Sequence, residues 1–358
     1  MEYNKKYFLG ANSAEGFVSH FSDCYKAEEG FNVYVIKGGP GTGKSSLLKR
    51  IAKKALEKGL KIELCPCSSD PDSLDGVIIP QIKTVLLDGT SPHVVEPIYP
   101  GVCEEIINLG EFWRSNMLKE NREKIMLTTA ENKLLHKKAS AYLLALGAIL
   151  RDNRALQLAS VNTKKVLSFA QELSKKHLKK KGYYGSEQVR FLSGITPKGV
   201  VSFPKTVTKA CKNLIILRDK IGGVSSLICD IFRQNALNCG YDIITLKNPF
   251  LPSCMYDHII IPELSLALVS ENSYITFESD ARRIHSRRFV DQGAIAEVKN
   301  RLKFNKKLGT ELLSEAVKTL KLAKLSHDKL ESYYINAMDF SKTEPLVKSI
   351  EGKIFTNC

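Results

Sequence analysis

The chain has 358 residues, of which 43% are hydrophobic, and its 53 Lys and Arg residues against 38 Asp and Glu residues leave a formal net charge of +15. This length suits two domains of ordinary size, and the apolar content is enough for two packed cores. The longest apolar run, Ala141 to Leu150, is too short to span a bilayer, and the first residues lack the apolar stretch of a signal peptide. We therefore expect a cytoplasmic protein that makes no use of a membrane.

Nine cysteines are scattered along the chain without the regular spacing of a disulfide framework. An odd number of cysteines and no export signal indicate reduced thiols. Cys65 and Cys67, together with Cys103 or His93, form a candidate metal site. The alternative is that these cysteines are free thiols, since the spacing is not C-x-x-C and no second pair follows.

The first predicted elements are a strand, a glycine-rich loop and a helix in succession. Val33 to Ile36 is a short apolar run, and the sequence GGPGTGKSS follows it from residue 38 to residue 46. Apolar residues then recur at helical spacing as far as Leu56, and Gly59 stands where a helix-capping glycine is expected. The loop fits the pattern G-x-x-x-x-G-K-[ST] of a phosphate-binding loop in the context that this pattern requires.

This loop predicts a binding site for ATP and Mg²⁺. Backbone amides of the loop and the N-terminus of the following helix form a positive concavity for phosphate oxygens. Lys44 is expected to reach the β- and γ-phosphates as a catalytic residue, and the Ser45 hydroxyl is expected to bind Mg²⁺. The predicted nucleotide-binding residues are Gly38, Gly39, Pro40, Gly41, Thr42, Gly43, Lys44, Ser45 and Ser46.

Two further strands are predicted at residues 75–80 and 83–88. The second is an apolar run that ends in Asp88, and phosphate-loop enzymes need an acidic residue at such a place to assist the metal. We predict that Asp88 has this catalytic and metal-binding role; the alternative is plain Asp-Gly turn chemistry. No glutamate follows Asp88, so the group that positions the attacking water is open. The polar candidates nearby are Asp70, Asp72, Asp75, His93 and Glu96.

The region from about residue 103 to residue 181 is predicted to be almost wholly helical, because it contains very few helix breakers after Gly110. We expect a helical appendage to the first core, in the form of a hairpin or lid. The charged and glycine-bounded stretch 179–185 is the best candidate for an interdomain linker.

The second half of the chain repeats the plan of the first. The segment FLGANSAEGFVSHF from Phe8 resembles FLSGITPKGVVSFP from Phe191, and the following blocks align in the same order, with Ser45 opposite Ser225. The expected fold is α/β, with two tandem P-loop NTPase-like domains. Each is expected to hold a mainly parallel sheet, helices and a helical appendage. The expected boundaries are 1–181 and 186–358, and the second core is expected to run from Phe191 to about Phe277 before helices that continue to the end.

The second copy has lost the residues that phosphate chemistry needs. In this alignment Arg218, Asp219, Ile221 and Val224 replace Gly38, Gly39, Gly41 and Lys44, and Ser270 stands opposite Asp88. An aspartate in the loop repels a phosphate group. We therefore expect one nucleotide site in each chain, in the first half. An arginine near His285 is a candidate finger for that site, with ordinary basic surface as the alternative; the arginines are Arg282, Arg283, Arg287 and Arg288.

The positive charge gathers in helical stretches, at residues 175–181 and between residues 299 and 329. Solvated helix faces are one interpretation, and binding of a nucleic acid or protein partner is the other. No zinc-finger spacing or aromatic RNA-binding motif supports a nucleic-acid interface.

The two cores resemble a bacterial family of uncharacterised, tandemly duplicated P-loop ATPase-like proteins. The blocks FLGANSAEGF, GGPGTGKSSLL, SLDGVIIP, LLDGTSPH and IIIPEL carry this resemblance and cover about half of the chain. The second loop departs from that family, in which the later half often keeps more of the phosphate-binding loop pattern than this chain does. The resemblance implies ATP binding and hydrolysis, and it implies no biological process.

These observations predict a Mg²⁺-dependent ATP-binding protein that acts as a slow ATPase through the first loop. One alternative is a kinase that transfers the γ-phosphate to a small acceptor. Such kinases often have a lid whose arginines close on the phosphates. The candidate lid arginines are Arg114, Arg122, Arg151 and Arg154. The other alternative is a nucleotide-switched scaffold whose basic helices bind nucleic acid or protein.

Overall fold

The computed structural model describes residues 5–356, and within them the chain forms two compact units. Unit 1 consists of segments 5–10, 19–139 and 318–356, and unit 2 consists of segments 11–18 and 140–317. The units are therefore discontinuous in sequence, whereas the repeat suggested continuous halves at 1–181 and 186–358.

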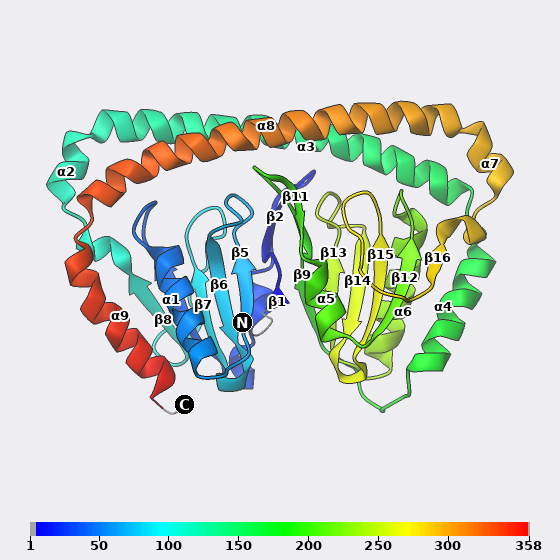
Figure 1. The fold of residues 1–358 in the computed structure, drawn as a ribbon, viewed down its shortest axis with the longest axis horizontal. Helices are drawn as coiled ribbons and strands as arrows, with labels where there is room; N and C mark the ends of the chain where they lie inside the picture. The colour runs from blue at the N-terminus through cyan, green and yellow to red at the C-terminus, as the bar shows by residue number, and fades with distance from the viewer. Residues whose placement is uncertain (1–4, 357–358) are drawn as a thin grey trace. The chain divides into compact units, whose positions relative to one another are not determined.

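Unit 1 is built on a six-stranded mixed sheet (Figure 1). In spatial order its strands are β1 (Lys5–Lys6), β5 (Glu63–Pro66), β6 (Leu74–Ile79), β7 (Thr84–Asp88), β4 (Asn32–Lys37) and β8 (Glu104–Asn108). Strand β6 runs antiparallel to β5 and β7, and the other neighbouring strands pair in parallel. The carboxyl ends of β4 and β7 therefore meet at one edge of the sheet.

Unit 2 contains a second six-stranded sheet with the same arrangement of directions. Its strands are, in order, β16 (Arg283–His285), β12 (Asn213–Arg218), β15 (Leu266–Glu271), β14 (Tyr256–Ile261), β13 (Ile243–Lys247) and β9 (Glu187–Arg190). Strand β14 is antiparallel to both neighbours, and the remaining pairs are parallel. The prediction of two α/β cores with mainly parallel sheets is confirmed.

Two two-stranded sheets, nine α-helices and six short 3-10 helices complete the described chain. The two-stranded sheets pair β2 (Gly10–Ser13) with β3 (Gly16–Ser19) and β10 (Ser193–Thr196) with β11 (Gly199–Ser202). Within residues 5–356 the helices are α1 (Lys44–Glu57), α2 (Ser115–Glu120), α3 (Arg122–Ala159), α4 (Thr163–His177), α5 (Pro204–Ala210), α6 (Gly223–Asn238), α7 (Gln292–Glu297), α8 (Lys299–Ala337) and α9 (Phe340–Phe355). None of these helices combines the length and the apolar character that crossing a bilayer requires.

Each sheet packs against helices through apolar faces at helical spacing. In unit 1, the α1 residues Leu48 and Ile51 are fully buried against the sheet, and Ile350 of α9 joins the same core. In unit 2, Phe232 of α6 is buried in a core that Val166 of α4 shares. Burying such side chains stabilises a core by about 1.5–3 kcal/mol each, so these faces fix α1 and α6 on their sheets.

Two edge strands lie where helix was expected. Residues 104–108 form β8, which pairs with β4, and residues 283–285 form β16, which pairs with β12. The sequence EEIIN of β8 is charged, so it lacks the continuous apolar run that marked the other strands. In β8 Glu104 and Ile107 are buried while Ile106 is exposed, so burial does not follow residue polarity and hydrophobic patterning missed the strand.

Candidate functional site

The glycine-rich loop at residues 38–46 lies where the topology of unit 1 brings two strand ends together. Strand β4 leads into the loop and α1 leaves it, with Gly43 in a left-handed conformation before the first helical residue. Strand β7 lies parallel to β4, and Ile36 is the register partner of Asp88. Asp88 therefore ends its strand beside the loop, as the sequence predicted for a metal-assisting residue.

The Lys44 side chain folds over its own loop. Its ammonium group donates hydrogen bonds to the carbonyl oxygens of Gly38 (2.8 Å) and Gly39 (2.9 Å), and lies 3.7 Å from Asp88 Oδ2. The Lys44 and Asp88 side chains are each only 12% exposed. The lysine and the carboxylate are therefore held close together at the loop, with most of both side chains buried.

The loop conformation is held by internal contacts. Thr42 is buried, and its hydroxyl donates to the Gly39 carbonyl (2.9 Å). A side chain at Gly38, where φ is +150°, would place a Cβ 2.7 Å from the Thr42 hydroxyl oxygen. Glycine is therefore required at this first position of the motif.

Ser45 and Ser46 have different surroundings. The Ser45 hydroxyl oxygen accepts a hydrogen bond from the Leu74 amide (2.9 Å), which ties the start of α1 to the start of β6. A hydroxyl oxygen has two lone pairs, so one remains for a metal ion. Ser46 is exposed on α1.

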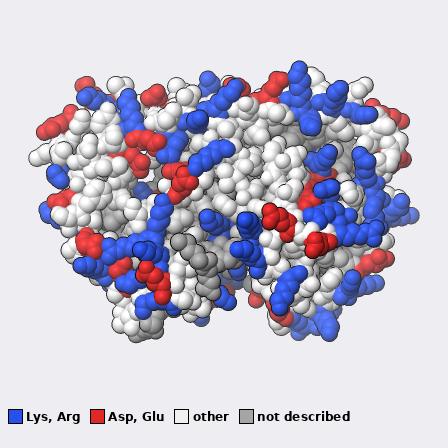
Figure 2. Space-filling model, in the orientation of Figure 1, with Lys and Arg blue, Asp and Glu red and all other residues white. Residues whose placement is uncertain are grey.

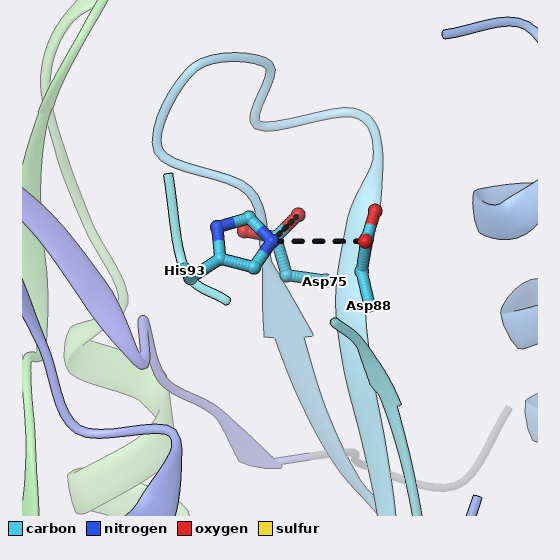
Figure 3. A group of neighbouring side chains, drawn as sticks. All are labelled: Asp75, Asp88 and His93. Atoms are coloured by element: carbon cyan, nitrogen blue, oxygen red, sulfur yellow. Dashed lines mark ion pairs between the residues drawn. The ribbon is translucent and has the colours of Figure 1, made fainter. Parts of the chain in front are cut away.

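Asp75, Asp88 and His93 form a buried group beside the loop (Figure 3). His93 Nε2 lies 3.9 Å from an oxygen of Asp75 and 3.9 Å from an oxygen of Asp88, and the His93 ring stacks on Phe21 at 4.4 Å. Asp88 also accepts hydrogen bonds from the amide (2.9 Å) and hydroxyl (2.6 Å) of Thr90. Ligand atoms of this kind and separation fit a divalent cation.

Burial sets the protonation of this group. It raises the pKa of Asp75 to about 8, with the Asp88 charge adding to the rise. It also lowers the pKa of His93 to about 4. At neutral pH Asp75 therefore retains its proton and His93 is neutral, and the low pKa makes His93 a weak base.

The remaining water-positioning candidates from the sequence lie outside this group. Asp70 pairs with Lys324 (3.3 Å), and Glu96 is an exposed partner of Lys37 (2.5 Å). Asp72 sits in the turn that Asp70 organises, with its amide donating to Asp70 Oδ1 (3.2 Å). Of the five candidates, the structure gathers Asp75 and His93 at the loop.

The loop is also covered by residues that sequence reasoning missed. The Gly41 amide donates to Glu331 Oε1 of α8 (3.2 Å), and the Gly39 backbone faces the rings of Trp113 and Tyr334. These two rings lie 5.5 Å apart. No local signal in the sequence pointed to them, because Glu331 lies 290 positions after Gly41.

A second group with metal-ligating side chains lies on α8. His327, Asp328 and Glu331 bring their ligand atoms within 4.8 Å of one another. Neither group found among residues 5–356 includes a cysteine, so the candidate metal site at Cys65 and Cys67 has no geometric support there. Cys358 lies outside the described residues.

The degenerate loop of unit 2 is shifted by one residue from the expected pairing. The Ser226 hydroxyl accepts from the Tyr256 amide (3.0 Å), as Ser45 does from the Leu74 amide. Strands β4 and β12 begin at Asn32 and Asn213, and the same offset pairs Ser45 with Ser226. Ser225, rather than Val224, therefore stands in the place of the motif lysine. The offset is the same before and after the loop, so the loop has no insertion; its different residues hid this register from sequence comparison.

The loop amides of unit 2 are bound by side chains of the same unit. Asp219 accepts from the amides of Ser225 (3.0 Å) and Ile221 (3.3 Å) and from the Gln157 side chain (2.8 Å). Gln157 in turn accepts from the Gly223 amide (2.9 Å). Asp219 is 2% exposed, so a carboxylate is fixed where a phosphate would need to bind.

Some of the arginines considered as finger or lid residues have other partners. Arg283 donates to Glu271 (3.3 Å) and to backbone carbonyls of its own unit. Arg151 and Arg154 belong to unit 2, and Arg151 lies 3.7 Å from Glu15 there. On the face seen in Figure 2, Lys and Arg side chains are interspersed with Asp and Glu.

Comparison with known proteins leaves the site to be interpreted from its geometry. No protein-family model matches the chain, and no curated protein and no solved structure matches it either.

Proposed function

We propose that this chain is a P-loop ATP-binding protein and a slow Mg²⁺-dependent ATPase with one nucleotide site, at the loop of unit 1. The observation that carries the proposal is the placement of Lys44 within 3.7 Å of Asp88, at the joined ends of two parallel strands. Loop amides and Lys44 would bind the triphosphate, while Ser45 and Asp88 would hold Mg²⁺. His93, which is neutral and lies 3.9 Å from Asp88, is placed to orient a water molecule beside the metal rather than to take its proton.

The loop of unit 2 lacks the features of a nucleotide site, which supports the proposal of one site in each chain. It has Ser225 in the lysine position, Ser270 opposite Asp88, and the Asp219 carboxylate on its amides. Each of these features disfavours a phosphate ligand. We assign unit 2 no nucleotide.

Of the four candidate lid arginines, Arg151 lies 3.7 Å from Glu15 and Arg114 donates to the Met338 carbonyl (3.4 Å), so two have partners other than a phosphate. We therefore prefer hydrolysis over transfer to an acceptor. The resemblance to tandem P-loop ATPase-like proteins also favours an ATPase. The kinase and scaffold alternatives stay predictions, and acceptor-stimulated ATP consumption or ATP-dependent, salt-sensitive nucleic-acid binding would support them.

The test is titration calorimetry of the full chain with ATP and Mg²⁺, together with phosphate-release assays. Lys44→Ala should weaken ATP binding by about 10- to 100-fold, because it removes a charge-assisted contact. Lys220→Ala is the matched control, since Lys220 is an exposed lysine in the loop of unit 2. Equal binding and turnover by Lys44→Ala and the native chain would contradict the proposal.

A further inference from the structure

The Gly41 amide of the intact loop already has an anionic partner. It donates to Glu331 Oε1 at 3.2 Å, and Glu331 belongs to the part of α8 that is in unit 1. Amides of this loop are the groups that bind phosphate oxygens in the proposed site. A carboxylate and a phosphate carry like charge, so they cannot share this amide.

The α8 backbone also lies directly against the loop. A Cβ at Gly41 would come within 2.9 Å of the Glu331 carbonyl oxygen and 2.7 Å of Ile335 Cγ1. The side of the loop at Gly41 is therefore closed by the helix itself as well as by one carboxylate.

Polar and aromatic contacts hold this part of α8 against the rest of unit 1. Lys324 pairs with Asp70 (3.3 Å), the Arg114 amide donates to the Ala337 carbonyl (2.7 Å), and Trp113 packs on Tyr334. Ile335 remains 46% exposed. Leu330 and Ala337 of the same segment are buried, so a ligand that displaces α8 must offset the loss of these apolar contacts as well as of the polar ones.

The loop of unit 2 shows what a permanent arrangement of this kind looks like. There the anion is Asp219, which belongs to the loop, is buried, and accepts from two loop amides and Gln157. In unit 1 the anion comes from a separate helix and makes one bond to the loop. Asp219 therefore occupies the loop of unit 2 permanently, whereas Glu331 can leave the loop of unit 1 when α8 moves.

We infer that Glu331 is a phosphate mimic that closes the loop of unit 1, and that a magnesium-bound nucleoside triphosphate displaces it and releases the end of α8, residues 324–337. This inference rests on the proposed function and adds its regulation. The apparent affinity for nucleotide is then lowered by the fraction of molecules in which α8 is docked.

The experiment measures ATP affinity by calorimetry in the presence of Mg²⁺, and follows the fluorescence of Trp113, which is the one tryptophan of the chain. Glu331→Ala should bind ATP about ten-fold more tightly than the native chain, because a competing charged hydrogen bond is lost. Glu331→Gln should fall between the two. In the native chain, saturating ATP should change Trp113 emission as Tyr334 leaves.

Glu311→Gln is the matched control, since it removes an exposed charge from the same helix away from the loop. It should keep native affinity. Asp70→Asn is a second test variant that loosens α8 without touching Glu331, and it should also increase affinity. Thermal melting checks that all variants are folded.

The two proposals fail in different ways. If the native chain binds ATP, Lys44→Ala does not, and Glu331→Ala gains no affinity, the closing role of Glu331 is overturned while the nucleotide site stands. Unchanged Trp113 emission at saturation would overturn the release of α8. If neither the native chain nor Glu331→Ala binds ATP, the proposed function itself is overturned, and the inference with it.

Discussion

The Lys44 ammonium lies 3.7 Å from the Asp88 carboxylate, although Lys44 begins helix α1 and Asp88 ends strand β7. The parallel pairing of β4 with β7 brings them together, since it sets Ile36 beside Asp88. Both side chains are mostly buried, so the attraction between their charges is stronger than it would be in water.

Asp88→Asn tests this pair. The variant should lower magnesium-dependent ATP turnover by about 100-fold, because a charged metal partner is removed from the reacting phosphate. Binding of ATP without Mg²⁺ should change little or improve, since a negative charge is gone. Phosphate release and calorimetry with and without Mg²⁺ measure both effects. Asp72→Asn is the control, and an equal loss of turnover in that exposed turn would argue against a specific role for Asp88.

Gly41→Ala tests the contact between the loop and α8. Gly41 has φ of +69°, and a Cβ there meets Ile335 and the Glu331 carbonyl. The variant should lose about 2–3 kcal/mol of unfolding free energy, from backbone strain and overpacking. Gly59→Ala is the matched control, because Gly59 has φ of +73° and nothing within 4 Å of its Cβ position. It should lose about 1 kcal/mol, and equal losses in denaturant unfolding would refute the close contact.

Asp219→Ala tests the filled loop of unit 2. It should destabilise the protein by about 3 kcal/mol, because the amides of Ser225 and Ile221 lose a buried acceptor. It should create no second ATP site, since Ser225 replaces the lysine. Urea unfolding and calorimetric stoichiometry measure the two outcomes, with Lys220→Ala as control. A second equivalent of bound ATP would show that Asp219 alone excludes nucleotide.

Asp257→Asn tests a buried acid of unit 2. Burial raises the pKa of Asp257 to about 7 despite hydrogen bonds from Asn248, with the charge of Asp219 adding to the rise, whereas the unfolded value is 3.8. The folded state therefore binds this proton more tightly than the unfolded state. The free energy of unfolding consequently falls as pH rises from about 4 to about 7, and the loss stays constant above pH 7.

The stability of Asp257→Asn relative to the native chain should accordingly increase across this window, by up to about 1.4 kcal/mol per pH unit. Urea unfolding at pH 4, 5.5, 7 and 8 measures the difference. A difference that is flat from pH 4 to pH 7, or that falls, would contradict the raised pKa.

Local chemistry made much of unit 1 predictable. The strand before the loop, the helix after it and Asp88 at a strand end all lie where the patterns placed them. The edge strands β8 and β16 were missed because they lack an apolar run, and the one-residue shift to Ser226 was hidden by loop differences.

The sequence by itself determined the loop, its flanking elements and the loss of the lysine in the second copy, because these depend on residues within a few positions of one another. Only the tertiary structure decided that Glu331 lies on the Gly41 amide, that Asp219 fills the other loop, and that each unit is assembled from separate segments of the chain. Such contacts join positions that local periodicity does not relate, and their geometry is set by how helices pack on the completed sheets.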